Sequence, residues 1–229
     1  LYRDDKLLGN YNAFFDEFNP IPSQQNAYSE KGKKGSISNT STNFLEGTIF
    51  RIVEDNFLDN STFFILDDLG NEWADHIGLG KSKVSFYHSK YNESRFSASA
   101  FHDVIGQAEK NLGNMTPQTE ILRAKANKWS SRFEIDGTQT NIQRLRKGES
   151  PDHAIAHFES ILVNPNRRIE VCLVINFISK TDLQDRLLRL QQNQPFQERN
   201  QIIQILWFIS SFISACKEVN ADVFIYCKE

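Results

Sequence analysis

Two short segments of this chain carry an acid, an imidazole and an amine at alternating positions. Residues 72–79 alternate in character, which places Asp75 on the same face as the apolar side chains of a strand. Residues 83–90 do the same for His88 and Lys90. A carboxylate can hold a hard divalent cation, and an amine beside it can orient a water or neutralise charge on a phosphoryl group. Because ionisable groups contradict the core pattern of these faces, they are the first candidates for a functional site.

These candidates lie on a segment that is typical of an antiparallel meander of three strands. Residues 62–68 are aromatic and aliphatic, and two short turns separate them from the alternating segments that follow. Adjacent antiparallel strands bring alternate side chains onto one face. We therefore expect Asp75, His88 and Lys90 to share a face.

A helix is predicted on each side of the meander. Residues 43–58 carry an apolar stripe with Glu46 at its edge. Glu46 is either a first-turn acid that the helix dipole favours or a group directed into a site, and Glu54 is its rival on the same helix. Residues 97–112 repeat the helical pattern, with Gln107 on the flank from which it could project over the sheet.

The C-terminal part of the chain predicts the rest of a layered fold. Residues 168–179 are almost continuously apolar, as in a strand that is buried on both faces. Two helices follow, over residues 181–192 and 197–219, and then a last strand over residues 221–227. A strand–helix–strand crossover makes its two strands parallel neighbours. The predicted fold class is therefore α/β, with a mixed central sheet (antiparallel meander, then parallel C-terminal strands) flanked by helices.

Residues 43–112 resemble the core of the PD-(D/E)xK nuclease superfamily, which has the restriction-endonuclease-like fold. The resemblance implies a set of catalytic residues and a metal site for Mg²⁺ or Mn²⁺. The implied catalytic residues are Asp75, His88, Lys90 and Gln107, and the implied metal ligands are Glu46, Asp75 and His88.

The chain departs from the family pattern at His88, where the third strand usually carries Glu or Asp. Neutral imidazole binds transition-metal cations well and Mg²⁺ poorly. Three interpretations stay open. His88 binds Mn²⁺-like ions, or the missing carboxylate comes from Glu46, Asp67 or Asp68, or the site is inactive and only binds.

A local excess of basic residues lies between residues 123 and 147 of an otherwise acidic chain. The candidates for contact with nucleic acid are Arg123, Lys125, Lys128, Arg132, Arg144, Arg146 and Lys147. Such a cluster can face phosphate groups, and a merely solvated surface is the alternative. Further on, His153 and His157 are four residues apart on a predicted helix, which is the spacing of a metal pair or of a plain surface turn.

Composition bounds the class of protein. The chain has 229 residues, 39% of them hydrophobic and 24% charged, and a net charge of −3, as in a globular protein without a global basic field. No apolar run approaches a membrane span, no signal peptide is visible, and the three cysteines lie in apolar surroundings, so we expect a cytoplasmic protein without membrane contact. Residues 1–35 are expected to form an N-terminal extension or linker, and residues 36–229 the α/β domain.

These patterns predict a metal-dependent nuclease domain that hydrolyses DNA phosphodiester bonds, as the effector part of a larger bacterial defence or restriction protein. A catalytically inactive module of the same fold that binds nucleic acid or protein is the alternative, and a hydrolase of RNA or of other phosphoesters stays open. The expected partners are nucleic acid, DNA rather than RNA, and either further domains of a longer chain or a second copy. GxSxG, P-loop and GxGxxG motifs do not occur, which argues against an esterase, an NTPase or a dinucleotide-binding protein.

Overall fold

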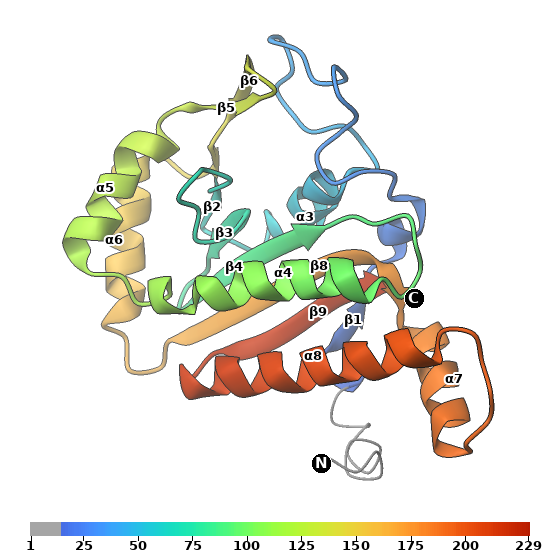
Figure 1. The fold of residues 1–229 in the computed structure, drawn as a ribbon. Coiled ribbons are helices and arrows are strands. Elements are labelled where there is room, and N and C mark those ends of the chain that lie inside the picture. The colour runs from blue at the N-terminus through green and yellow to red at the C-terminus, as the bar shows by residue number, and fades with distance from the viewer. Residues whose placement is uncertain (1–14) are drawn as a thin grey trace.

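A seven-stranded mixed sheet forms the centre of the fold (Figure 1). The computed structural model describes residues 15–229, so the first 14 residues of the expected N-terminal extension lie outside the described residues. The strands follow the spatial order β1-β9-β8-β4-β3-β2-β7. Their bounds are β1 Phe18–Pro20, β2 Phe63–Leu66, β3 His76–Leu79, β4 Lys83–Lys90, β7 Leu145–Lys147, β8 Arg168–Ser179 and β9 Asp222–Lys228. A separate hairpin consists of β5 Arg132–Ile135 and β6 Thr138–Gln143.

Helices cover both faces of the central sheet. Their bounds are α3 Ile49–Phe57, α4 Ala98–Lys110, α5 Thr119–Trp129, α6 Pro151–Leu162, α7 Lys180–Gln191 and α8 Arg199–Glu218, with short 3-10 helices η1 Pro22–Asn26 and η2 Leu112–Asn114. Helices α4 and α8 run side by side over one face, and α3 packs on the other (Figure 1). Within the described residues, none of these helices has both the length and the apolar character that a membrane crossing requires.

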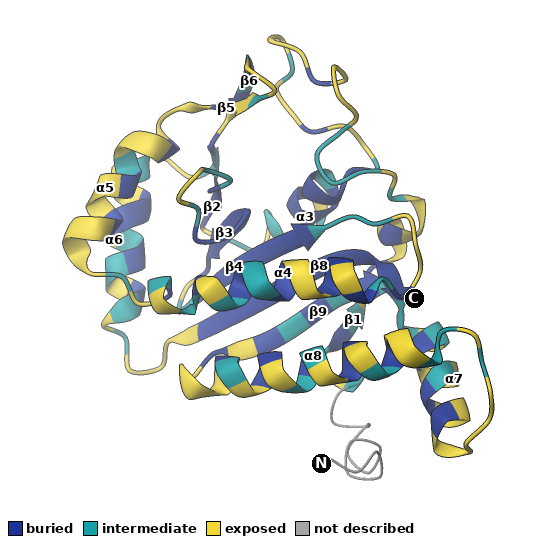
Figure 2. Ribbon diagram, viewed as in Figure 1, coloured by how far each residue is buried: buried dark blue, intermediate teal, exposed yellow. Residues whose placement is uncertain are grey.

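The pairing of the strands confirms the predicted α/β class and mixed sheet. Strands β2, β3 and β4 form an antiparallel meander, with Ile77 of β3 opposite Phe86 of β4. Strand β8 pairs in parallel with β4 on one side and with β9 on the other. It is buried along nearly its whole length, between β9 and β4 (Figure 2).

The pleat of the meander sorts side chains into two cores. Phe86 belongs to the large core that α4 and α8 cover, whereas Tyr87, the next residue of β4, belongs to a smaller core beneath α3. Because side chains alternate along a strand, His88 and Lys90 lie on the face of Phe86. The face predicted to carry the candidate residues is therefore the one that α4 covers.

The first helix is shorter than predicted. The pattern indicated residues 43–58, but α3 begins at Ile49 because the hydroxyl of Thr48 caps it and accepts a hydrogen bond from the backbone N–H of Arg51 at 3.2 Å. Glu46 consequently lies in the turn before the helix, where it is exposed. Its predicted place on the helix is wrong.

Part of the expected N-terminal extension belongs to the sheet. Strand β1 lies within residues 1–35 and pairs in parallel with β9. Further along, Ser29 forms a bridge with Thr48 at the start of α3. The described part of the extension thus packs with the α/β unit.

Candidate functional site

The polar candidates gather at one end of the strands, where β2 ends, β3 begins and β4 ends. We call this border of the sheet, and not an outermost strand, the sheet edge. Asp75 directly precedes β3, and its backbone continues the pairing beyond that strand. Its N–H donates to the carbonyl of Tyr87 at 3.0 Å, and its own carbonyl accepts from the N–H of Asp67 at 2.9 Å. This pairing fixes the Asp75 side chain in a buried position, with 3% of the residue exposed.

Gln107 of α4 reaches the carboxylate of Asp75 from above. The backbone N–H of Ser89 donates to one carboxylate oxygen of Asp75 at 2.6 Å, and the amide nitrogen of Gln107 lies 3.4 Å from the other. The same amide nitrogen lies 3.4 Å from a carboxylate oxygen of Glu72. The structure therefore brings Asp75 and Gln107 together, as the sequence predicted, and adds Glu72, for which the sequence pattern carried no signal.

Lys90 lies at the open side of this group. Its ammonium is 3.8 Å from a carboxylate oxygen of Asp103, one turn before Gln107 on α4, and its side chain is 32% exposed. At the other end of the same helix face, the ammonium of Lys110 is 3.8 Å from Glu72. Acidic and basic groups thus alternate between the sheet edge and α4, and solvent reaches both amines, since 32% of the Lys90 side chain and 60% of the Lys110 side chain are exposed.

A second group of charges borders this site on the side of α3. The ammonium of Lys31 lies 2.8 Å from a carboxylate oxygen of Asp68, which follows β2. The neighbouring Glu30 is held at the start of α3, since its carbonyl accepts from the N–H of Phe50 at 3.0 Å. Sequence patterns gave no signal for Glu30 or Lys31, because their position depends on the fold of a segment without any periodicity.

Burial and like charges raise the pKa of the Asp75 carboxyl well above its usual range. Removal from water is the largest cause, and the carboxylates of Asp68 and Glu30 raise the pKa further, while the Ser89 N–H and the ammonium of Lys31 lower it. Burial also raises the pKa of Glu30, although Lys31 and Lys90 oppose that shift. Asp75 is thus a carboxyl group whose charged form would gain from a nearby cation.

His88, at the position where the resemblance implies a third-strand acid, is enclosed. It has no exposed surface, and neither ring nitrogen has a hydrogen-bond partner among the described residues. Burial lowers its pKa to about 3, with a smaller contribution from the ammonium of Lys110. The ring is therefore neutral at ordinary pH and lies within the packed interior of the sheet face.

Two other acids that were alternatives lie outside the site. Glu54 projects into the other face, where its carboxylate forms hydrogen bonds with the guanidinium of Arg146 at 2.6 and 3.0 Å and lies 3.7 Å from His76. Glu46 is in the exposed turn before α3. The interpretation that either acid completes the site is wrong for this arrangement.

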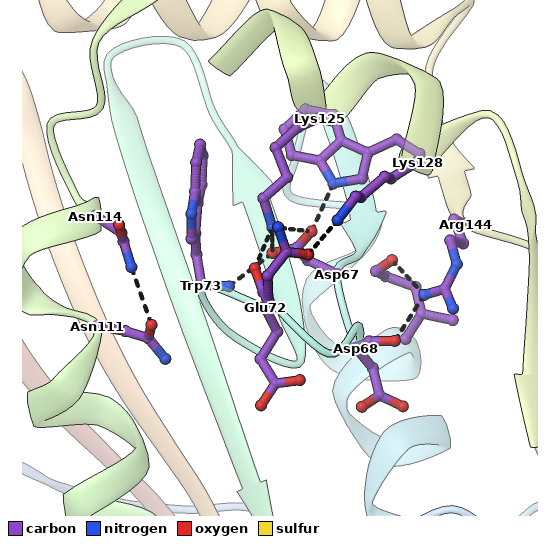
Figure 3. A network of polar contacts seen from close by, with 12 residues as sticks. Asp67, Asp68, Glu72, Trp73, Asn111, Asn114, Lys125, Lys128 and Arg144 are labelled. Atoms are coloured by element: carbon purple, nitrogen blue, oxygen red, sulfur yellow. Dashed lines mark hydrogen bonds and ion pairs between the residues drawn. The ribbon is translucent and has the colours of Figure 1, made fainter. Parts of the chain in front are cut away.

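Asp67 is also unavailable, because it forms a buried ion pair. Its two carboxylate oxygens accept from the ammonium of Lys125 at 2.9 and 2.7 Å, and one of them also accepts from the indole of Trp129 at 2.7 Å. Figure 3 shows Asp68 and Glu72 pointing to one common side, away from this pair. Asp68 is therefore the acid of the two that faces the candidate site.

The metal ligands implied by the resemblance do not converge. Across residues 15–229, no three His, Cys, Asp or Glu side chains are placed so that they could share a metal ion. A smaller set of oxygen donors fits a hard cation better. One oxygen of Asp75 and one of Glu72 lie at the same 3.4 Å from the Gln107 amide, whose own oxygen becomes a donor if the amide is turned over. Mg²⁺ commonly takes one or two carboxylates and completes its shell with water and substrate phosphate.

Most of the predicted basic surface serves the fold. Lys125 binds Asp67, Arg144 donates to the carbonyls of Leu66 and Asp68, and Arg146 binds Glu54. Lys147 donates to the carbonyls of Leu58 and Asp59, and Arg123 lies 3.6 Å from Glu159. Lys128 and Arg132 remain on the surface, bonded to the side-chain oxygens of Asn71 and Asn141. The seven residues therefore do not form one continuous phosphate-facing surface, and the prediction is wrong for the buried Lys125 and Arg144.

The two histidines of α6 do not form a pair. His157 contacts the carbonyl of Gly80 at 2.8 Å, while His153 contacts the hydroxyl of Ser150 at 3.0 Å. The helix was predicted correctly, and each imidazole has its own partner.

No protein-family model, curated protein or solved structure matches the chain.

Proposed function

We propose that this protein is a divalent-metal-dependent phosphodiesterase that hydrolyses DNA, with a core of the restriction-endonuclease-like type. The observation that supports the proposal is that Gln107 of α4 reaches Asp75 at the sheet edge, while Lys90, on the same face, reaches Asp103 of the same helix. These residues come from elements in the order helix, three antiparallel strands, helix and parallel strand, which is the order that the resemblance implies. A place within a larger bacterial defence or restriction protein stays a prediction from the sequence.

Each residue has a physical role in this proposal. Glu72 and Asp75 are the carboxylates that would hold Mg²⁺ or Mn²⁺, with the amide of Gln107 between them. A bound cation of this kind makes hydroxide available near neutral pH by lowering the pKa of a water ligand. Lys90 projects toward solvent at the same edge, where its charge can orient the attacking water or stabilise the negative charge that develops on the phosphate.

A binding module without catalysis is the second candidate function. Two observations favour it: His88 is neutral and enclosed where the family has an acid, and one oxygen of Asp75 is already bonded to the backbone of Ser89. In that case the same edge would bind nucleic acid without cutting it.

A cleavage assay separates the two functions. Supercoiled plasmid is incubated with the purified protein and Mg²⁺ or Mn²⁺, in parallel with Asp75→Asn, Lys90→Met and a Lys81→Gln control at an exposed lysine of the turn between β3 and β4. We expect the wild type to nick or cut the plasmid, and each site variant to lose about 10²-fold or more in rate, as is common when a group that stabilises the transition state is removed. Equal cleavage by the wild type and both site variants would contradict the proposal. Binding without cleavage would support the module.

A further inference from the structure

Two segments far apart in the sequence project side by side from the edge that carries Asp75. One is the loop after Lys31, and the other is the hairpin of β5 and β6 (Figure 1). Lys31 at the base of the loop contacts Asp68 at 2.8 Å, and Arg144, which follows the hairpin, donates to the carbonyl of Asp68 at 2.9 Å. Both projections therefore start directly beside the candidate site.

Each projection ends in a defined turn. In the loop, the backbone N–H and the hydroxyl of Ser36 both donate to the carbonyl of Lys33, at 2.9 and 2.6 Å, and Gly35 takes the positive φ of 75° that this turn requires. In the hairpin, Asp136 and Gly137 have φ values of 49° and 74°, as in a two-residue turn that suits paired antiparallel strands. The turns hold Lys33, Lys34 and the hairpin tip in fixed places.

A small hydrophobic cluster joins the two projections. Ile37 of the loop packs with Phe133 and Ile142 of the hairpin, and all three are buried. The N–H of Asn141 also donates to the carbonyl of Ser41 at 3.0 Å. The loop and the hairpin therefore form one wall whose parts keep their relative position.

A groove with a volume of about 180 Å³ opens between the loop and the hairpin tip. Lys33, Lys34 and Thr138 line it, and Asp136 is the one acid among the described residues that do so. Both lysines are exposed, and among residues 15–229 neither pairs with a carboxylate. They differ in this from Lys125, Arg144 and Arg146, whose charges are used inside the fold.

We propose that this groove, between the turn at residues 33–36 and the β5–β6 tip, binds the phosphate backbone of the nucleic-acid substrate and leads it to the edge at Asp75. The inference rests on the proposed function for the identity of the substrate. The unpaired lysines attract phosphate groups, and their contact with the backbone releases counterions. Lys33 and Lys34 give this wall a local positive charge in a chain whose net charge is −3, and such a local charge attracts phosphate groups.

The test measures DNA binding in an Asp75→Asn background, so that cleavage does not interfere. A fluorescein-labelled duplex is titrated at several salt concentrations with this protein and with the added pair Lys33→Gln and Lys34→Gln. The control pair is Lys81→Gln and Lys217→Gln, two exposed lysines at the opposite edge of the sheet. We expect the loop pair to weaken binding about tenfold or more and to lower the slope of log affinity against log salt by about 2, while the control pair changes neither.

A gain-of-binding variant keeps the proposal testable if the loop pair fails to fold. Asp136→Asn removes the acid of the groove and retains a residue that tolerates positive φ, so it should tighten binding several-fold. Equal effects of the loop pair and the control pair, no change with Asp136→Asn, or no DNA binding at all would overturn the inference. Binding by the groove in a wild type that never cuts DNA would support the inference and contradict the proposed function.

Discussion

At the scale of single residues, the candidate site combines residues whose positions the sequence predicted with others that it missed. Alternation on the strands placed Asp75 and Lys90 on one face, and helical spacing placed Gln107 above them, as the structure has them. Glu72 was missed because the alternation of residues 72–79 places it on the face opposite Asp75. In the structure β3 begins only at His76, and Glu72 ends a turn in which its N–H donates to the carbonyl of Leu69 at 3.0 Å. Glu30 was missed because only tertiary contacts bring its segment to the start of α3. A periodic helix or strand can be predicted from its own sequence, whereas contacts between irregular segments cannot.

His88 makes stability depend on pH in a predictable direction. In the unfolded chain its pKa is near 6.5, and burial lowers it to about 3 in the fold, so the unfolded chain binds a proton more readily. The contribution of the neutral ring is complete above pH 6.5 and is lost as the pH falls toward 3. Between about pH 7 and pH 5 the loss from this residue should be about 2 kcal/mol.

Denaturant unfolding of wild type and His88→Phe at these two pH values measures this effect. The variant should lose less stability than the wild type on acidification, by about 2 kcal/mol. The exposed His153 supplies the control, and His153→Gln should follow the wild type. A parallel decline of all three proteins would show that His88 is not a buried neutral ring.

At the scale of elements, the Asp67–Lys125 pair attaches α5 to the end of β2 (Figure 3). Both side chains are almost fully buried, at 0% and 3% exposure. Lys125→Met should therefore lower the free energy of unfolding by about 3–5 kcal/mol, because it leaves Asp67 buried without its partner.

A matched variant on the same helix provides the comparison. Lys128 is exposed and its ammonium donates to the Asn71 side chain, so Lys128→Met should change stability by less than about 0.5 kcal/mol. Chemical denaturation of both variants gives the two values. Similar values for both would mean that Lys125 does not hold α5 in place.

Arg146 serves to distinguish a structural cation from one that binds DNA. Its two hydrogen bonds to the buried Glu54 predict that Arg146→Gln costs about 3 kcal/mol of stability. The salt dependence of DNA binding should stay as in the wild type. If Arg146→Gln kept the stability of the wild type but lowered the slope of log affinity against log salt, Arg146 would be a residue that contacts phosphate.

The sequence predicted some elements more accurately than others, because the residues at the ends of each element differ in how clearly they mark its bounds. Strands β4 and β8 have the predicted bounds, since turns and continuous apolar runs define their ends. Helix α3 starts later than predicted because the cap at Thr48 overrides the apolar pattern before it. The β5–β6 hairpin was not predicted, although its Asp136-Gly137 turn is a recognised hairpin signal.

The whole molecule combines two cores, one on each face of the sheet, with a small cluster at the hairpin and one polar edge. The sheet separates a large core under α4 and α8 from a smaller core under α3. Because side chains alternate between these two faces, the pleat determines which side chains lie under α4 at the polar edge. The sequence predicted this layered arrangement, because buried strands and crossover helices have strong patterns. It did not predict that Arg144 and Arg146 stabilise the interior, because a run of basic residues carries no information about their partners.

A calorimetric titration with Mn²⁺ tests most directly whether the polar edge is a metal-dependent active site. The wild type should bind Mn²⁺ with a heat signal and should melt at a higher temperature when the ion is present, since binding to the folded state stabilises it. Asp75→Asn and Glu72→Gln should both abolish the signal, and Glu149→Gln, at an exposed acid just before α6, should retain it. Identical Mn²⁺ binding by the wild type and the two site variants, or no binding by any of them, would contradict the account.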